Sequence, residues 1–138
     1  MWNHEVSVDA PVSPSAVWQR YVDLDSWPIW SPGTEKVSLD GEFTAGSEGV
    51  ITNAAYGSTP FRLTSVTDGE TFAMESPVSE DVTLRTVCRV VALAEGGSRV
   101  THQVELDGPG SEQLGAEIGE GLSNNLSEGL RSLVESVG

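Results

Sequence analysis

The segment Val6–Gly41, VSVDAPVSPSAVWQRYVDLDSWPIWSPGTEKVSLDG, sets out the order of elements that decides the fold. Its first residues, Val6–Ala10, alternate apolar and polar side chains, which is typical of a half-buried strand. Ser13 and Pro14 then predict a helix start, because a serine hydroxyl caps free backbone amides and proline suits the first helical position. The segment therefore begins with a strand that leads into a helix.

A second short helix is expected where the chain passes through Trp27-Pro28. Pro28 cannot continue the preceding helix, so it starts a new turn that carries Trp27 and Trp30. Pro32-Gly33 ends this turn, and residues 35–40 alternate like a strand again. One strand, two short helices and another strand predict a sheet that wraps around a hollow, with the helices closing one end.

The middle of the chain reads as strands joined by tight turns. Asp40-Gly41, Asp68-Gly69 and Gly96-Gly97 are hairpin signals, because such pairs reach positive φ at low cost. With the first strand, seven antiparallel strands are expected, and the later six lie at 35–40, 48–55, 60–67, 71–76, 80–94 and 98–107.

The last part of the chain, 111–137, predicts one long amphipathic helix, which makes the fold class α+β. Gly115 and Gly119 fall inside its apolar stripe, where each glycine costs a helix about 1 kcal/mol relative to alanine. Two explanations are open: the sheet backbone approaches closely, or space is left for a ligand. The stripe carries leucines and glycines but no aromatic residue. We therefore expect cavity residues from the inner face of the sheet and from the Trp-bearing helix.

Length and charge bound the function. The 138 residues form one domain, 1–138, and 21 acidic against 7 basic residues give a net charge of −14. Such a surface repels nucleic acid and anionic lipid headgroups, so neither is an expected partner. A single cysteine, Cys88, and an N-terminus without a basic and then apolar leader predict a cytoplasmic protein without membrane insertion.

The chain resembles the START-related SRPBCC superfamily, in its polyketide cyclase/dehydrase-like branch. The resemblance covers essentially the whole chain, and its strongest segments are Val6–Gly41, ETFAMES at 70–76, GGSRVTHQVELDGP at 96–109 and GAEIGEGLSNNLSEGL at 115–130. These motifs are specific for fold and nearly silent on activity. The resemblance implies a helix-grip (START-like) fold with a deep pocket for hydrophobic small molecules, including lipids and polyketide-like compounds.

Three residues are candidates for chemistry. His102 shares a strand face with Val100 and Val104, which should be the inner face, so its imidazole is either a hydrogen-bonding group or acid/base in the pocket or a satisfied core residue. Tyr56 either offers its phenol to a ligand or packs under a loop. Arg85 is expected to point outward and pair with surface acids; in the opposite register it would enter the pocket and stabilise an enolate.

No cofactor is expected. His4, Cys88 and His102 lie on three different strands without paired spacing, which argues against a metal site. The chain has no Gly-x-Ser-x-Gly turn for a nucleophile, and the glycines of 115–121 do not match a dinucleotide fingerprint.

The sequence thus favours a protein that holds a hydrophobic small molecule, with His102 fixing its orientation. Trp27 and Trp30 either plug the end of the grip or line the pocket and stack on a ligand. The expected ligand-binding residues are Trp27, Trp30, Tyr56, Phe61, Met74, His102, Ile118, Gly119 and Leu122. The alternative is a cyclase or dehydratase that closes rings by aldol chemistry, using His102, Tyr56 and Arg85. A third interpretation, docking on a protein partner through the acidic face, and a homodimer stay open.

Overall fold

The computed structural model describes residues 2–31, 33–54, 57–78 and 80–137. Its helices are α1 (Pro14–Val22), α2 (Trp27–Trp30) and α3 (Ser111–Val137), with a short 3₁₀ helix, Leu24–Ser26, between the first two. Its strands are β1 (Trp2–Ala10), β2 (Thr34–Asp40), β3 (Glu48–Asn53), β4 (Gly57–Thr67), β5 (Thr71–Pro77), β6 (Thr83–Ala92) and β7 (Ser98–Asp107). The expected elements are confirmed, with ends that move by a few residues.

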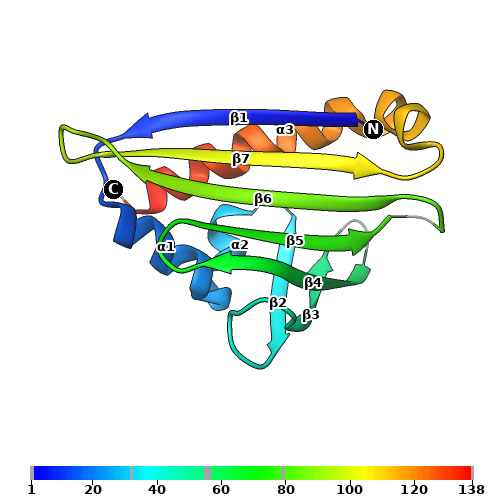
Figure 1. The fold of residues 1–138 in the computed structure, drawn as a ribbon, viewed down its shortest axis with the longest axis horizontal. Helices are drawn as coiled ribbons and strands as arrows, with labels where there is room; N and C mark the ends of the chain where they lie inside the picture. The colour runs from blue at the N-terminus through cyan, green and yellow to red at the C-terminus, as the bar shows by residue number, and fades with distance from the viewer. Residues whose placement is uncertain (1, 32, 55–56, 79, 138) are drawn as a thin grey trace.

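All seven strands belong to one antiparallel sheet in the order β1-β7-β6-β5-β4-β3-β2 (Figure 1). Neighbours along the chain pair with one another from β2 to β7, as short hairpin turns require. The first strand instead pairs with the last, so β1 and β2 form the two edges. Gly41, Gly69 and Gly96, at the three predicted turns, all have positive φ.

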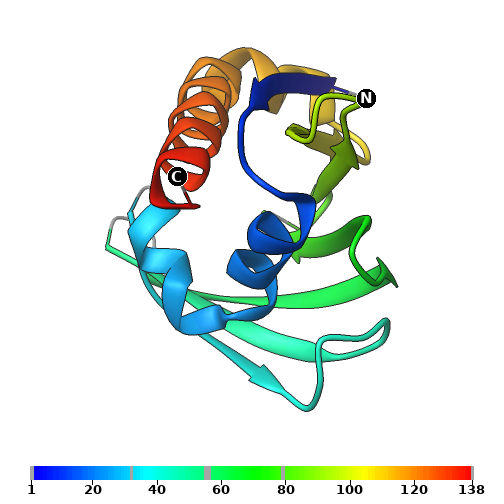
Figure 2. The ribbon, with the colours of Figure 1, turned by 90° about the vertical axis from the view of Figure 1, so that its left-hand side faces the viewer.

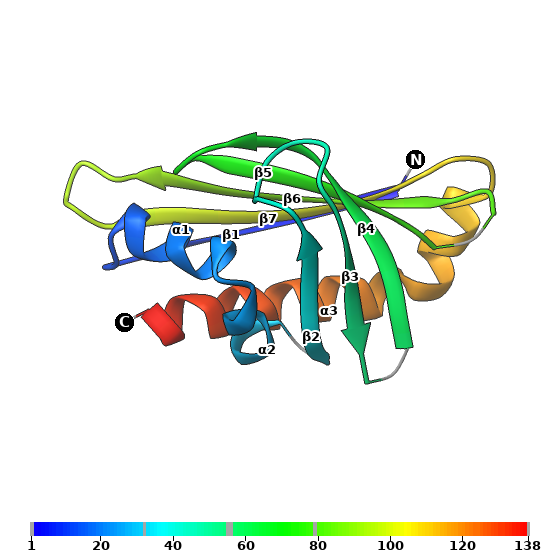
Figure 3. The same ribbon diagram turned by 90° about the horizontal axis from the view of Figure 1, so that it is seen from below.

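The sheet curves around α3, which is the grip that the sequence predicts. Viewed along the long axis, the sheet, α3 and the α1–α2 pair surround a central region (Figure 2). Residue contacts join α3 to β1 and β7 along one edge of the sheet and to both α1 and α2. Seen from below, α1 and α2 lie near the C-terminal end of α3 (Figure 3). The two short helices thus close one end of the grip.

Local signals explain how α1 is placed. The Ser13 hydroxyl accepts a 3.2 Å hydrogen bond from the Ala16 amide, and Pro14 occupies the first helical position, as predicted. Arg20 then donates a 2.8 Å hydrogen bond to the carbonyl of Ser136 in α3. The helix is therefore capped at its start and tied to the C-terminal helix near its end.

The two glycines of α3 make room for an indole. A Cβ on Gly115 would overlap Trp2 Cγ, and a Cβ on Gly119 would lie 2.8 Å from Trp2 Cζ2. Neither sequence-based explanation describes this arrangement, because the close neighbour is a side chain from β1 and not the sheet backbone or a ligand. Trp2 belongs to β1, whose first residues the sequence pattern did not include.

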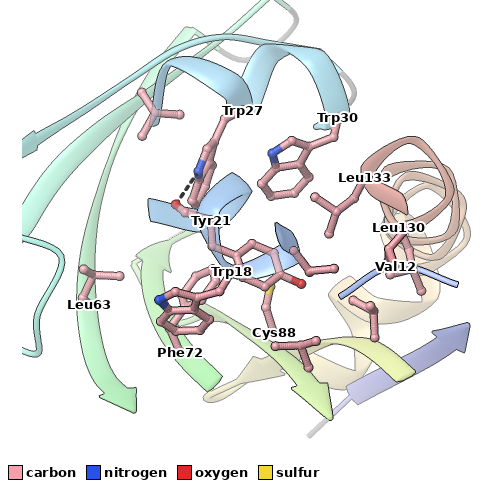
Figure 4. Packing of buried hydrophobic residues seen from close by; sticks show 14 of the residues in the cluster. Val12, Trp18, Tyr21, Trp27, Trp30, Leu63, Phe72, Cys88, Leu130 and Leu133 are labelled. Atoms are coloured by element: carbon pink, nitrogen blue, oxygen red, sulfur yellow. Dashed lines mark hydrogen bonds between the residues drawn. The ribbon is translucent and has the colours of Figure 1, made fainter. Parts of the chain in front are cut away.

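An aromatic cluster fills the end of the grip closed by α1 and α2 (Figure 4). Tyr21 is fully buried and lies edge-on to Phe72, with ring centroids 5.0 Å apart. Trp18 donates a 3.0 Å hydrogen bond to Asp68 in the β4–β5 turn. Packed aromatic rings thus fill this end of the grip, and Trp27, Trp30 and Phe72 of the same cluster border the open space.

Candidate functional site

A cavity of about 200 Å³ lies between the inner face of the sheet, α2 and the middle of α3. Every wall of the grip contributes to it. Its lining residues are Trp27, Trp30, Ser31, Thr34, Asn53, Phe72, Met74, Leu84, Thr86, Cys88, His102, Val104, Leu122, Asn125, Leu126 and Gly129.

Strand register builds the floor of this cavity. Met74, Thr86 and Val104 stand opposite one another across β5, β6 and β7. The next inward row along the same strands is Phe72, Cys88 and His102. Because side chains alternate between faces along a strand, these two rows point to the same side, toward α3. The third wall is α3, and Leu122 and Leu126 lie one helical turn apart on it.

His102 is held at the buried end of the cavity by Tyr21. The Tyr21 hydroxyl and His102 Nε2 are 2.7 Å apart, and His102 is only 3% exposed. Burial lowers the pKa of His102 from 6.5 to about 4, so the imidazole is neutral at pH 7. Burial also raises the pKa of the Tyr21 phenol well above its ordinary value. The pair is therefore neutral, and the imidazole orientation is fixed from the α1 side.

The two tryptophans of α2 line the cavity and also close its end. Stacking of either indole on a ligand stays a prediction. Their indole N–H groups differ. Trp27 donates a 2.9 Å hydrogen bond to the carbonyl of Tyr21. Trp30 Nε1 is the one buried side-chain polar atom without a hydrogen-bond partner among the residues the structure describes. Trp30 as a whole is 6% exposed.

Among the residues that the structure describes, the lining carries no Asp, Glu, Lys or Arg side chain. Its titratable groups are His102 and Cys88, and burial raises the pKa of the Cys88 thiol, which stays protonated. Polar character comes from neutral hydroxyl and amide groups at Ser31, Thr34, Thr86 and Asn125. The cavity is thus largely apolar and uncharged although the whole chain has a net charge of −14.

Five of the expected ligand-binding residues meet in this cavity: Trp27, Trp30, Met74, His102 and Leu122. Phe61 instead packs in the core and borders a separate open groove of about 510 Å³ on the side of β2–β5, with Asp40, Glu48 and Arg62. Ile118 is half-buried on α3 outside the cavity lining, and Gly119 lies against Trp2. Tyr56 lies outside the described residues.

Arg85 points away from the cavity. Its guanidinium lies 3.6 Å from Glu105 on the next strand, and its side chain is 41% exposed. Arg89 pairs likewise with Glu5 at 2.6 Å. The outward facing expected for Arg85 is confirmed, and the opposite register, in which Arg85 would stabilise an enolate, does not occur.

Sequence reasoning missed several lining residues. Thr86 and Cys88 sit on the same face of β6, between the outward arginines, so the period-2 pattern of β6 could have found them. Asn125 and Gly129 follow Leu122 by about one and two helical turns on α3, and their i, i+3 and i, i+7 spacing was the available signal. No local pattern marks the bond between Tyr21 and His102.

The chain belongs to the family described as "Polyketide cyclase / dehydrase and lipid transport", whose model matches residues 1–138. This confirms the resemblance to the SRPBCC polyketide cyclase-like branch. No curated protein matches the sequence.

Solved structures share the fold at low sequence identity. Ara h 8.0201 superposes with a TM-score of 0.79 at 15% identity, covering 99% of this chain and 97% of that one. The di-domain ARO/CYC BexL of the BE-7585A biosynthetic pathway gives 0.79 at 18% identity, with 99% of this chain on 46% of that one. Truncated norcoclaurine synthase from Thalictrum flavum gives 0.75 at 13% identity, covering 99% and 92%. These likenesses establish the helix-grip fold.

Two kinds of feature are absent from the residues that the structure describes. None of the helices is both long and apolar enough to cross a membrane. No group of three or more His, Cys, Asp or Glu side chains in the described ranges is arranged to hold a metal ion.

Proposed function

We propose that this protein binds a hydrophobic small molecule in the cavity between the sheet and α3. The observation that carries the proposal is the lining itself: aromatic and aliphatic side chains from the sheet, α2 and α3 converge with a few neutral polar groups. Concave, mostly apolar sites of this composition are those that small ligands occupy. Family membership points the same way, because the family description includes lipid transport.

The volume limits the size of the ligand. Ligand pockets commonly enclose about 300–1,000 Å³, whereas this cavity encloses about 200 Å³. An apolar cavity of about 150 Å³ is enough for benzene. A single ring with a short substituent therefore fits inside the cavity, and a longer acyl chain would extend out through its open side.

Ring closure by a cyclase is the second candidate, and one observation favours it: His102 presents an imidazole in the cavity wall. Two others make it weaker. The pKa of about 4 makes this imidazole a poor proton acceptor at pH 7, and Arg85 lies outside the cavity. Binding needs only the apolar lining, so it is the function that the geometry supports best.

The proposal is tested by blocking the cavity. Leu122 and Leu114 are both half-buried on α3, but only Leu122 lines the cavity. Acetophenone, a single-ring probe, is titrated into wild type, Leu122→Trp and Leu114→Trp, and binding is followed by isothermal calorimetry. We expect binding to wild type and Leu114→Trp and loss of at least about tenfold in affinity for Leu122→Trp, since an indole there takes the ligand's volume. Equal affinity for all three proteins contradicts the proposal.

A further inference from the structure

The imidazole of His102 keeps one ring nitrogen free for a ligand. Its one hydrogen bond among the described residues joins Nε2 to the Tyr21 hydroxyl at 2.7 Å. Among those residues, Trp30 Nε1 is the one side-chain polar atom that is closed to solvent and lacks a partner. Nδ1 of His102 has no partner either, so it belongs to the small exposed part of this residue. Because His102 lines the cavity, Nδ1 is reached from there.

The Tyr21 hydroxyl determines which ring nitrogen of His102 carries the proton. Tyr21 is fully buried, and its hydroxyl makes no other hydrogen bond to a described residue. If Nε2 donated, the phenolic O–H would be buried without an acceptor, which costs the full desolvation penalty of that group. The O–H therefore donates to Nε2, and the proton of the neutral imidazole lies on Nδ1. Nδ1–H is thus a donor on the side of the ring away from this bond.

Resting on the proposed function, we infer that His102 Nδ1–H donates a hydrogen bond to the cavity ligand, which is a neutral hydrophobic molecule with a carbonyl group. A ketone or ester oxygen accepts a bond, and the group has no proton to donate. The lining residues Met74, Val104 and Leu122 are apolar, so the rest of the molecule is hydrophobic. The bond fixes the carbonyl end of the ligand against β7.

A carboxylate is a poor occupant for two reasons. None of the described residues that line the cavity carries a full charge at pH 7, so an anion would lose its hydration without gaining a counter-charge. To supply that charge, His102 would have to take a proton on Nε2 and give up the bond from the Tyr21 hydroxyl. Burial opposes this protonation, since it lowers the pKa of the imidazole to about 4.

Three molecules of similar size test the inference. Acetophenone carries C=O where α-methylstyrene carries C=CH₂, and benzoate carries a carboxylate on the same ring. Dissociation constants are measured for wild type, Thr86→Val and the double variant Tyr21→Phe/His102→Leu. The double variant removes both partners of the buried bond, so it leaves no unpaired hydroxyl. Thr86→Val is the matched control, because it removes a hydroxyl from the same cavity and keeps the shape of the side chain.

We expect wild type and Thr86→Val to bind acetophenone about tenfold more tightly than α-methylstyrene, the scale of one hydrogen bond to a buried donor. The double variant should still bind α-methylstyrene, with a preference between the two molecules below about twofold. Benzoate should bind wild type at least about tenfold more weakly than acetophenone.

A second readout needs no variant. In ¹H–¹⁵N spectra of the wild-type imidazole, Nδ1 of His102 should be the protonated nitrogen before any ligand is added. Its proton signal should move downfield with acetophenone and much less with α-methylstyrene.

The outcomes separate the inference from the proposed function. If wild type binds acetophenone and α-methylstyrene equally, the cavity is a binding site but the donor role of His102 is wrong. A proton on Nε2 in the ligand-free protein, a preference that persists in the double variant, or benzoate binding as tight as that of acetophenone also overturns the inference. Loss of the preference in Thr86→Val would assign the donor to Thr86 instead. If none of the three molecules binds, the proposed function and the inference fall together.

Discussion

The Tyr21 hydroxyl lies 2.7 Å from Nε2 of His102, which joins α1 to β7 across 81 residues of sequence. The Tyr21 ring is also packed edge-on against Phe72, so the phenol is held from both sides. The bond fixes the imidazole at the buried end of the cavity. This contact determines how His102 faces a ligand, and it connects the folding of the core to the shape of the site.

Tyr21→Phe should lower the free energy of unfolding by about 1–2 kcal/mol, because it leaves a buried ring nitrogen unpaired. Urea denaturation measures the loss. A double-mutant cycle with His102→Leu isolates the bond, and a coupling energy of about 1 kcal/mol is expected. Strict additivity of the two single changes would show that the bond contributes nothing.

The burial of His102 predicts a pH-dependent stability. Its pKa is lowered from 6.5 to about 4, so between these values the unfolded chain holds a proton that the folded protein does not. Above pH 6.5, His102 is neutral in both the folded and the unfolded protein, and it does not change the free energy of unfolding. As pH falls from 6.5 toward 4, the free energy of unfolding decreases by about 1.4 kcal/mol per pH unit, because only the unfolded chain binds the proton. The measurement is urea unfolding of wild type between pH 7 and 5.

His102→Gln is the control for this pH series. Carboxylate titration and the high negative charge affect both proteins alike, so the difference between their slopes belongs to His102. The variant should lack the extra loss of stability below pH 6.5. Parallel curves for the two proteins would contradict the buried, neutral imidazole.

Replacing a glycine of α3 by alanine should have opposite effects on stability at Gly115 and at Gly121. Gly115→Ala should destabilise the protein by about 1–3 kcal/mol, because its methyl group meets the base of the Trp2 side chain. Gly121→Ala should instead stabilise it by about 0.5–1 kcal/mol, since nothing lies near its Cβ position and alanine favours a helix. Thermal denaturation measures both.

Trp2→Ala provides the control for Gly115. Without the indole, Gly115→Ala should become neutral or stabilising relative to the Trp2→Ala parent. If the penalty persists in that background, the glycine is needed for another reason and the contact with Trp2 is not its cause.

Arg85→Gln separates binding from the ring-closure alternative. Its ion pair with Glu105 is partly exposed, and such pairs contribute about 0–1 kcal/mol to stability. We therefore expect little change in unfolding and less than a twofold change in acetophenone affinity. A loss of affinity beyond about fivefold would place the guanidinium at the ligand.

Much of the fold could be predicted because its signals are local. Alternation in Val6–Ala10, the Ser13 cap and the Asp-Gly turns each report on a few neighbouring residues. The predicted strand began at Val6 and did not include Trp2, although Trp2 continues the same alternation. Its contact with Gly115 depends on how β1 lies along α3, and that arrangement is set by tertiary packing.

The site was only partly predictable for the same reason. The alternation of side chains along a strand correctly placed His102 on the inner face and Arg85 on the outer face. Strand register, which sets Cys88 opposite His102, is a property of the pairing between β6 and β7. The Tyr21 bond to His102 and the unpaired Trp30 N–H arise from long-range packing, which no sequence period reports.

The central claim is that this cavity holds a small hydrophobic molecule, and native mass spectrometry of the protein purified from its own host tests it most directly. Wild type should carry a stoichiometric hydrophobic compound that organic extraction releases. Leu122→Trp purified in the same way should be empty, and Leu114→Trp should be loaded. A wild-type protein that emerges empty and also fails to bind acetophenone would contradict the account.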